Sequence, residues 1–354
     1  MTESASEIPK ERLLEPSDAE VDNPPLTEYQ IQQWRNEGFT LVDGLVPDDL
    51  VDQLLTDAVE IFPKVGSDEA TVIRDFGEGM TFPSQSEYFN DLTLHPRILE
   101  ASSQLLNAPI TALRLTQSDL WPKYSSANNQ DAFDNQDQRM HMDYPNHTLT
   151  HPSPWEEPEA VEIILYLANQ TEVGGSTAIV PRVGLDDEAY KPPLIHSPGI
   201  GDIPWINDRL QAEEWFHRNK PEVAELRGRL YRREKYTRYR KGSVLFYRQD
   251  VWHRGTPLSK NKVRFAQNLT FRMAEASWIS TLHPGWSWAM YKPDQQMERL
   301  IATLSPEQRS VLGFPPPGDS YWDHRKVDAV EARYGAFGFD ATPYREQLTW
   351  TGLH

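Results

Sequence analysis

Three residues of metal-ligand type stand out in the sequence by their order and spacing. His141 and Asp143 are separated by one residue, and His253 follows far along the chain. If the first pair lies in a strand, side chains two positions apart project to the same face, so both can point into one cavity. Two imidazoles and one carboxylate that leave half of an octahedron open are the ligand set of non-haem Fe(II) sites that activate O2.

Arg264 adds a second chemical requirement to this pattern. It follows His253 inside a predicted strand at residues 263–271. A guanidinium is planar and always charged, so it can hold a carboxylate through two parallel hydrogen bonds, which a lysine cannot reproduce. A His-X-Asp triplet is weak evidence alone, but the later histidine, followed by an arginine on the next predicted strand, makes a metal centre the favoured interpretation.

The order of His-X-Asp, a long gap, His and then Arg resembles the phytanoyl-CoA dioxygenase family of Fe(II)- and 2-oxoglutarate-dependent oxygenases. The resemblance covers roughly residues 27–273. It implies that His141, Asp143 and His253 are the catalytic iron ligands, with 2-oxoglutarate and O2 as co-substrates. It also implies that Arg264 forms a salt bridge with the distal carboxylate of 2-oxoglutarate.

Three more residues resemble the family's co-substrate contacts less closely, namely Lys123, Thr256 and Tyr166. Residues 174–181 belong to the resemblance, but residues 181–184 depart from the family, because a Gly-Ser-His-like turn that usually occurs there is missing. The departure removes a histidine beside the site and leaves the substrate open. Family members act on varied small molecules, so the family name does not imply an acyl-CoA substrate.

Asp143 also bears on the reaction that the resemblance implies. Related halogenases carry Gly or Ala in its place so that chloride can bind iron, whereas this chain keeps the carboxylate. Hydroxylation of a small-molecule substrate, with release of succinate and CO2, or another oxidation such as desaturation, is therefore expected over halogenation. Two other functions stay open: a non-catalytic small-molecule binder on the same fold, and a metal-dependent isomerase or hydrolase without 2-oxoglutarate.

Composition narrows the class of protein and its partners. The chain has 354 residues, and 53 acidic against 35 basic residues give a formal charge of −18, which opposes nucleic-acid binding. It has no cysteine, so disulfides, thiolate metal sites and cysteine nucleophiles are excluded. We find no secretory signal or membrane span in the sequence and expect a cytoplasmic enzyme without membrane partners. The oligomeric state is not predicted.

The N-terminal part of the sequence predicts a leader followed by helices. Residues 1–25 are polar and acidic, and we expect a flexible leader. Thr27 and Gln30 form a capping-box pattern that predicts the start of a helix ending near Asn36. A strand at 38–43 and a second helix at 47–62 follow.

From about residue 110 the sequence changes to short apolar runs bounded by turn-forming residues. The predicted strands are 111–116, 160–168, 176–180, 243–247 and 263–271. This predicts a mainly β fold with flanking helices, a double-stranded β-helix of the jelly-roll type. We expect a single oxygenase domain over 26–354, with the jelly-roll core at about 110–275 and a C-terminal aromatic extension over 283–354.

Several segments near the predicted site have open roles. The polar stretch 125–138 and the stretch 184–227, with a predicted helix at 209–217, are long enough for lids or substrate walls. The basic segment 229–241 could receive an anionic substrate, although we favour surface charges that pair with acids. His147 and His151 are expected to be solvated loop residues rather than alternative ligands.

Overall fold

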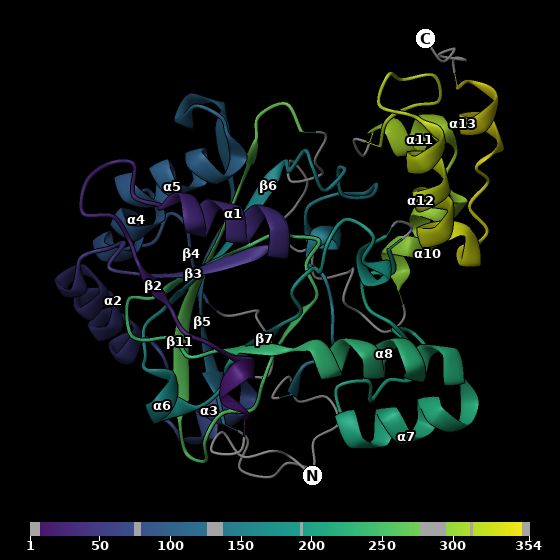
Figure 1. Cartoon of the computed structure of the whole chain (residues 1–354). Coiled ribbons are helices and arrows are strands. Elements are labelled where there is room, and N and C mark those ends of the chain that lie inside the picture. Colours follow the sequence, from purple (N-terminus) through teal and green to yellow (C-terminus); the bar gives the residue numbers. More distant parts are fainter. Residues whose placement is uncertain are drawn as a thin grey trace.

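The computed structural model describes residues 8–73, 79–125, 137–191, 194–276, 295–311 and 314–348. Most of the predicted polar loop at 125–138, and the start of the aromatic extension at 283–294, lie outside these ranges. Within them, strands form a double-stranded β-helix whose two sheets are not closed into a barrel, with helices on the outside (Figure 1).

The described strands form one sheet of seven strands and one of four. The larger sheet has the order β2 (Ser17–Asp18), β3 (Phe39–Asp43), β9 (Val244–Tyr247), β6 (Ala160–Tyr166), β11 (Val263–Met273), β5 (Leu113–Tyr124) and β4 (Met80–Thr81). The smaller sheet has the order β1 (Leu13–Leu14), β8 (Lys235–Thr237), β7 (Thr177–Ile179) and β10 (His253–Gly255).

The predicted strands of the larger sheet are present, and β5 is longer than expected. The sequence predicts only 111–116, but β5 runs to Tyr124 and pairs along most of β11. Its continuation contains Gln117 and Asp119, which are partly buried because they face the space between the two sheets. Polar residues on that inner face hide the strand from a search for apolar runs.

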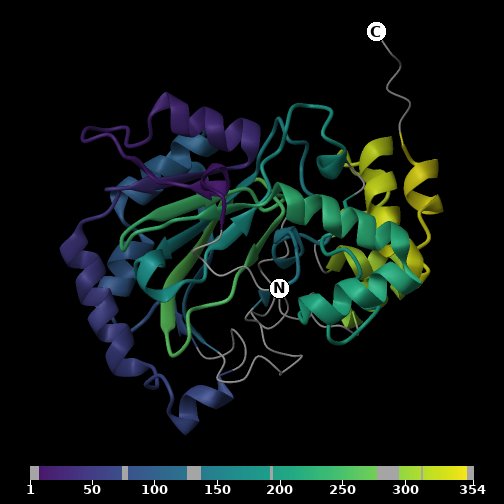
Figure 2. The same ribbon diagram turned by 60° about the horizontal axis from the view of Figure 1, so that its bottom comes forward.

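The described helices of the N-terminal half cover the outer face of the larger sheet (Figure 2). They are α1 (Glu28–Glu37), α2 (Asp48–Ile61), α3 (Asp68–Val72), α4 (Glu87–Thr93) and α5 (Pro96–Leu106). The capping box is confirmed, because Thr27 Oγ1 accepts from the backbone of Gln30 and the Gln30 side chain accepts from the backbone of Thr27. Trp34 on α1 is fully buried in the hydrophobic cluster that joins these helices to the sheet.

The predicted flexible leader differs from the structure. Leu13 and Leu14 pair with β8 of the smaller sheet, and Ser17 and Asp18 pair with β3 of the larger one. The side chain of Gln30 donates to the backbone oxygens of Ser17 and Asp18. These pairings at the sheet edges satisfy backbone hydrogen-bonding groups of the segment. The segment therefore forms short strands, although its polar composition predicts a flexible leader.

The described helices of the C-terminal part and of the long middle segment lie on the other side of the strands (Figures 1 and 2). The middle pair is α7 (Arg209–Asn219), which was predicted, and α8 (Pro221–Arg233), which was not; α6 (Gln170–Val173) lies earlier in the chain. The C-terminal ones are α10 (Gln296–Thr303), α11 (Pro306–Val311), α12 (His324–Tyr334) and α13 (Thr342–Glu346). No helix in the described part of the chain has the length and hydropathy needed to cross a membrane.

The aromatic extension is held against the loop that follows the predicted ligands. Phe314, Trp322 and Tyr334 are buried in a cluster that includes Leu149 of this loop. Tyr334 donates its hydroxyl hydrogen to the carbonyl of Leu149 at 2.6 Å, and Arg333 donates to that of Thr150 at 2.6 Å. The extension therefore contacts the jelly roll next to the site.

Candidate metal centre

His141, Asp143 and His253 come together between the two sheets. The backbones of the two histidines form an isolated bridge, with N–H to carbonyl distances of 3.0 and 2.9 Å. The backbone N–H of Asp143 donates to the carbonyl of Gln249, in the turn that leads to β10. Each of the three side chains offers a ligand atom, and these atoms lie within 4.8 Å of one another. The triad can therefore bind a metal ion.

The local structure around the first two ligands is a bridge and a turn rather than the expected strand. Asp143 has helical backbone angles and precedes a short 3-10 helix, Tyr144–Asn146. Met142 packs in the core between the sheets with no exposed surface. The carboxylate nevertheless reaches the same centre as His141, because the backbone turns immediately after the bridge.

Both histidines are oriented by backbone carbonyls. Nδ1 of His141 lies 2.9 Å from the oxygen of Arg139, and Nδ1 of His253 lies 3.1 Å from the oxygen of Val251. A proton on each Nδ1 leaves the lone pair of Nε2 for a metal, which is the usual arrangement of a histidine ligand. The Nε2 atoms lie 3.6 and 3.1 Å from the Asp143 oxygens.

Burial and neighbouring charge set the protonation of the histidines. Burial, with His253 nearby, lowers the pKa of His141 to about 3, so its imidazole is neutral at pH 7. Burial also acts to lower the pKa of His253, but the charge and hydrogen bond of Asp143 outweigh it and raise that pKa. The carboxylate thus favours a positive charge at the place where a metal ion would lie.

Tyr247 is a site residue that the sequence did not reveal. Its hydroxyl donates to Oδ2 of Asp143 at 2.7 Å, and its ring centroid lies 4.8 Å from that of His253. It is the last residue of β9, at the end of an apolar run. A tyrosine that ends a buried strand beside a predicted ligand is the only signal the sequence offers.

Arg264 lies on β11 with a free donor in a buried position. Its Nη1 donates to the carbonyl of Gly175 at 2.6 Å, and its guanidinium carbon lies 5.9 Å from the centroid of the Tyr166 ring. Its Nε is buried and has no hydrogen-bond partner among the described residues. A buried donor without an acceptor is costly, so the structure fits a carboxylate ligand at this arginine.

The three weaker candidates lie around Arg264. Lys123 is its register partner on β5 and donates Nζ to the carbonyl of Thr256 at 3.0 Å. The hydroxyl of Thr256 donates to Ser176 O at 2.9 Å, which leaves it only an acceptor role toward a ligand. The hydroxyl of Tyr166 lies 2.7 Å from that of Thr177. The structure brings all three to the arginine end of the site.

Tyr239 completes this end and was not singled out in the sequence. Its ring stacks on Tyr166 with centroids 3.8 Å apart and an interplanar angle of 3°. Its hydroxyl donates to the carbonyl of Gly174 at 2.8 Å. It belongs to the basic segment 229–241, where the charged residues around it in the sequence indicate an exposed stretch, although Tyr239 itself is buried.

The expectation that His147 and His151 are solvated loop residues is wrong. Their exposed fractions are 4% and 6%, because the C-terminal helices and the sheet cover the loop. Burial lowers the pKa of each to about 4. His151 has Nδ1 3.1 Å from the carbonyl of Pro152 and accepts from the backbone of Leu194 at Nε2. Nε2 of His147 lies 3.2 Å from Oε1 of Glu162.

The basic segment 229–241 mostly pairs with acids. Arg233 binds Asp187, and Arg240 donates to Asp43 at 2.8 Å. Further pairs join Arg238 to Glu15 and Lys241 to Asp52. These pairs favour the surface-charge interpretation over an anion-binding site.

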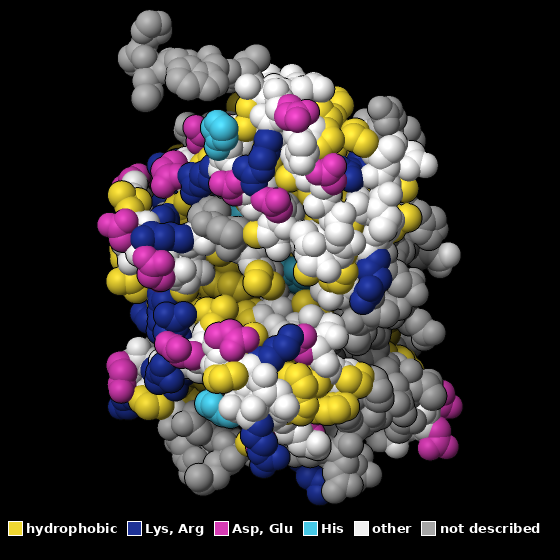
Figure 3. Space-filling view, turned by 90° about the vertical axis from the view of Figure 1, so that its right-hand side faces the viewer, with side chains coloured by type: hydrophobic (Ala, Val, Ile, Leu, Met, Phe, Trp, Pro, Cys, Tyr) yellow, Lys and Arg dark blue, Asp and Glu magenta, His cyan; other side chains and the backbone are white. Residues whose placement is uncertain are grey.

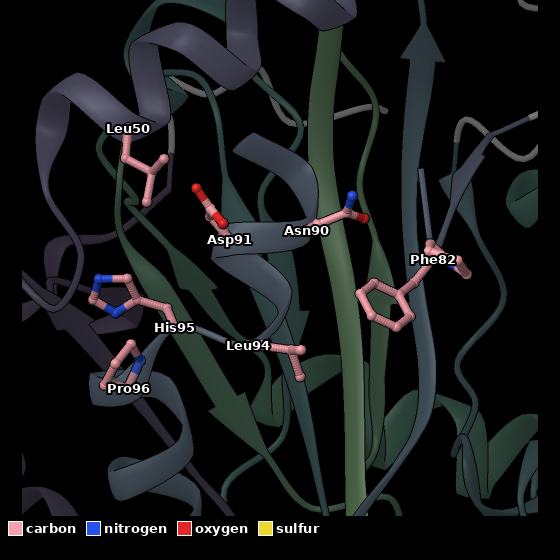
Figure 4. Close-up of a pocket in the computed structure, with 8 residues that line it drawn as sticks. Leu50, Phe82, Asn90, Asp91, Leu94, His95 and Pro96 are labelled. Carbon is pink, nitrogen blue, oxygen red and sulfur yellow. The ribbon is translucent and has the colours of Figure 1, made fainter. Parts of the chain in front are cut away.

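The described part of the surface has hollows of different character. On the side of the C-terminal helices the molecule is hollowed between these helices and the α7–α8 pair, with hydrophobic side chains in the hollow (Figure 3). A separate cavity of about 500 Å³ lies among α2, α4 and α5. Its labelled lining residues include none of the predicted site residues (Figure 4): Leu50, Phe82, Asn90, Asp91, Leu94, His95 and Pro96.

Comparison with known proteins gives one family and several remote structural likenesses. The sequence profile described as phytanoyl-CoA dioxygenase (PhyH) matches residues 34–266. No curated protein matches the sequence. The structure of EvdO2 from Micromonospora carbonacea var. aurantiaca complexed with 2-oxoglutarate is 15% identical, with 72% of this chain and 94% of that chain covered and a TM-score of 0.47.

Two further solved structures are similarly remote. The epimerase SnoN in complex with Fe3+, alpha ketoglutarate and nogalamycin RO is 16% identical over 71% of this chain and 85% of its own, with a TM-score of 0.43. HygX from Streptomyces hygroscopicus with iron bound is 16% identical over 71% and 88%, with a TM-score of 0.43. Likenesses this remote carry neither a substrate nor a reaction to this chain.

Proposed function

The chain belongs to the phytanoyl-CoA dioxygenase family, and on that premise we propose that it is an Fe(II)- and 2-oxoglutarate-dependent dioxygenase that hydroxylates a small molecule. The observation that carries the proposal is the pairing of two features in one space between the sheets. One is the His141, Asp143 and His253 triad. The other is the buried Nε of Arg264, which has no acceptor in the described chain.

The residues present fit both groups that this function needs. His141 and His253 would hold Fe(II) through Nε2 and Asp143 through its carboxylate, which leaves positions open for other ligands. Arg264 would hold the distal carboxylate of 2-oxoglutarate, with Lys123 and Tyr166 beside it. Bound iron would supply the activation of O2 at the expense of 2-oxoglutarate, which gives succinate and CO2.

The chain's own residues orient the metal ligands and exclude water from one side of the centre. The carbonyls of Arg139 and Val251 hold the imidazoles in the ligand tautomer, and Tyr247 fixes one oxygen of Asp143. The C-terminal extension covers the loop after Asp143, which keeps water away from this side of the centre. The retained carboxylate of Asp143 supports hydroxylation, or another oxidation, over halogenation.

The deciding experiment measures succinate release over a panel of small metabolites. We expect release that requires Fe(II), 2-oxoglutarate and O2 together, and that the variants His141→Ala and Asp143→Ala abolish. Metal titration of the same variants gives a readout that does not depend on a substrate. Metal binding that persists in both variants would refute the triad, and turnover of a metabolite without 2-oxoglutarate would favour the isomerase or hydrolase alternative.

A further inference from the structure

A row of polar side chains crosses the inner face of the larger sheet. Strand register places Gln117 of β5 opposite Thr270 of β11, Thr270 opposite Glu162 of β6, and Glu162 opposite Tyr247 of β9. The hydroxyl of Thr270 donates to Oε2 of Glu162 at 2.5 Å and lies 3.4 Å from Gln117. Since Tyr247 donates to Asp143, the row leads directly to the metal centre.

This row lies at the opposite end of the sheet from the proposed co-substrate site. Thr270 and Arg264 have the same orientation on β11, because they are an even number of residues apart. At about 3.3 Å per residue, roughly 20 Å of strand separates them. Glu162 is therefore too far from Arg264 to contact the same carboxylate of 2-oxoglutarate.

Glu162 is a buried carboxylate with incomplete partners. Its exposed fraction is 3%. Oε2 accepts from Thr270, but Oε1 makes no hydrogen bond within the described part of the chain, although Nε2 of His147 lies 3.2 Å away. Burial, and then the charge of Asp143, raise the pKa of Glu162 well above its usual value. No described arginine or lysine forms an ion pair with it.

A second carboxyl group lies on the same inner face. Asp119 is two residues from Gln117 on β5, and burial raises its pKa to about 6. Asp119 faces Asn268 across the sheet, so donors and acceptors continue along this wall. Such groups lose hydrogen bonds to water on folding, and a bound molecule with matching donors would restore them.

On the oxygenase function proposed above, we propose that Glu162 is a specificity-determining residue whose Oε1, beside His147, accepts a hydrogen bond from an O–H or N–H donor of the substrate. The substrate class is then a small molecule with a hydroxyl or amino group near the carbon that is oxidised. Anchoring that group on β6 holds the substrate next to the triad, because Tyr247 links the neighbouring strand to Asp143.

The first test needs no substrate and compares two buried carboxylates. Glu162→Gln removes a carboxyl group whose charged form is disfavoured by burial, whereas Asp250→Asn breaks a complete pair in which Arg248 donates at 2.9 and 3.1 Å. At pH 8 we expect the Tm of metal-free Glu162→Gln to rise by about 2 °C and that of Asp250→Asn to fall. A fall in Glu162→Gln as large as in the control would make Glu162 a structural residue and overturn the proposal.

The second test uses a panel in which each carbon skeleton is present as the alcohol, the amine and the carboxylate. Succinate release by the iron-loaded wild type should be stimulated by alcohols or amines and not by the matching carboxylates. With Glu162→Gln we expect KM to rise about tenfold for an alcohol and about a hundredfold for an amine, because the amide keeps an acceptor but loses the charge. Stimulation by carboxylates alone, or an unchanged KM, would overturn the proposal.

Two binding measurements distinguish a wrong role for Glu162 from a wrong oxygenase function. Metal titration and 2-oxoglutarate binding depend on the triad and on Arg264, which Glu162 does not contact. If both remain in Glu162→Gln while the KM for every stimulating compound is unchanged, the oxygenase function stands and the role of Glu162 is refuted. If neither ligand binds the wild type, the oxygenase function itself is refuted.

Discussion

Replacement of Arg264 should weaken 2-oxoglutarate binding by a factor that can be worked out from its contacts. One N–H of Nη1 already donates to the carbonyl of Gly175, and the orphan Nε together with a terminal N–H can form the two parallel hydrogen bonds that a carboxylate accepts. Each hydrogen bond to a charged group contributes about 1.5 to 3 kcal/mol. Loss of two bonds therefore predicts a rise in Kd of about 10² to 10⁴ for Arg264→Ala.

Arg264→Lys provides a graded comparison. It keeps the positive charge but replaces the planar fork by a single ammonium group, so about one bond is lost and Kd should rise roughly 10- to 100-fold. The assay is calorimetric titration of 2-oxoglutarate into protein loaded with Mn(II), which avoids turnover. Thermal unfolding of each variant shows whether loss of the Gly175 contact alone changes the fold.

Arg272→Ala is the matched control on the same strand. Its guanidinium donates to the carbonyls of Met273 and Ala276, at the end of β11 away from Arg264. It should leave the Kd for 2-oxoglutarate within about threefold of the wild type. If Arg264→Ala behaves like this control while remaining folded, the assignment of Arg264 as the co-substrate residue is refuted.

Three further predictions concern the triad and its surroundings. Asp143→Ala removes the only anionic member of the triad and should weaken Mn(II) binding about 100-fold or more in the same calorimeter; an unchanged Kd would argue against the triad. Tyr247→Phe removes the hydrogen bond to Asp143 and should weaken Mn(II) binding about tenfold, whereas a change in Tm without a change in metal affinity would show a purely structural role. Burial lowers the pKa of His151 to about 4, so the unfolded chain binds one more proton between its ordinary pKa of about 6.5 and pH 4. The free energy of unfolding should therefore fall as the pH is lowered from about 6.5 to 4, and it should fall by about 3 kcal/mol less in His151→Gln; equal pH dependence of the two proteins would contradict this.

The residues of the candidate site could be predicted because that prediction depends on residue type and order. The triad and Arg264 are far apart in the sequence, but each has a side chain that few other residues can replace, and the structure brings all four between the sheets. The larger sheet followed from apolar runs such as β6, which is buried on both faces.

The supporting residues could not be predicted because their roles depend on what faces them. Tyr247 and Tyr239 are ordinary strand and loop tyrosines until strand register places them beside Asp143 and Tyr166. His147 and His151 looked solvated because the helices that bury them come almost two hundred residues later. Polar residues on the inner face of β5 likewise interrupt the apolar pattern, so the sequence predicts only the first part of this strand.

Glu162, unlike the tyrosines, has a recognisable signal in the sequence. It is the one charged residue in the apolar run of β6, and it has the same orientation as Tyr166 four residues later. An isolated acid at that spacing in a fully buried strand indicates a polar interior. Only the cross-strand register shows that this interior continues to the metal centre.

The pairing partners of the short strands β1 and β2 determine when each strand can form during synthesis. Ser17 and Asp18 find their partners in β3, only about 25 residues further along the chain. Leu13 and Leu14 pair with Tyr236 and Thr237, about 220 residues further along the chain, so this pair cannot form until β8 has been made. Two strands that are three residues apart in the sequence therefore find their partners at different stages of synthesis.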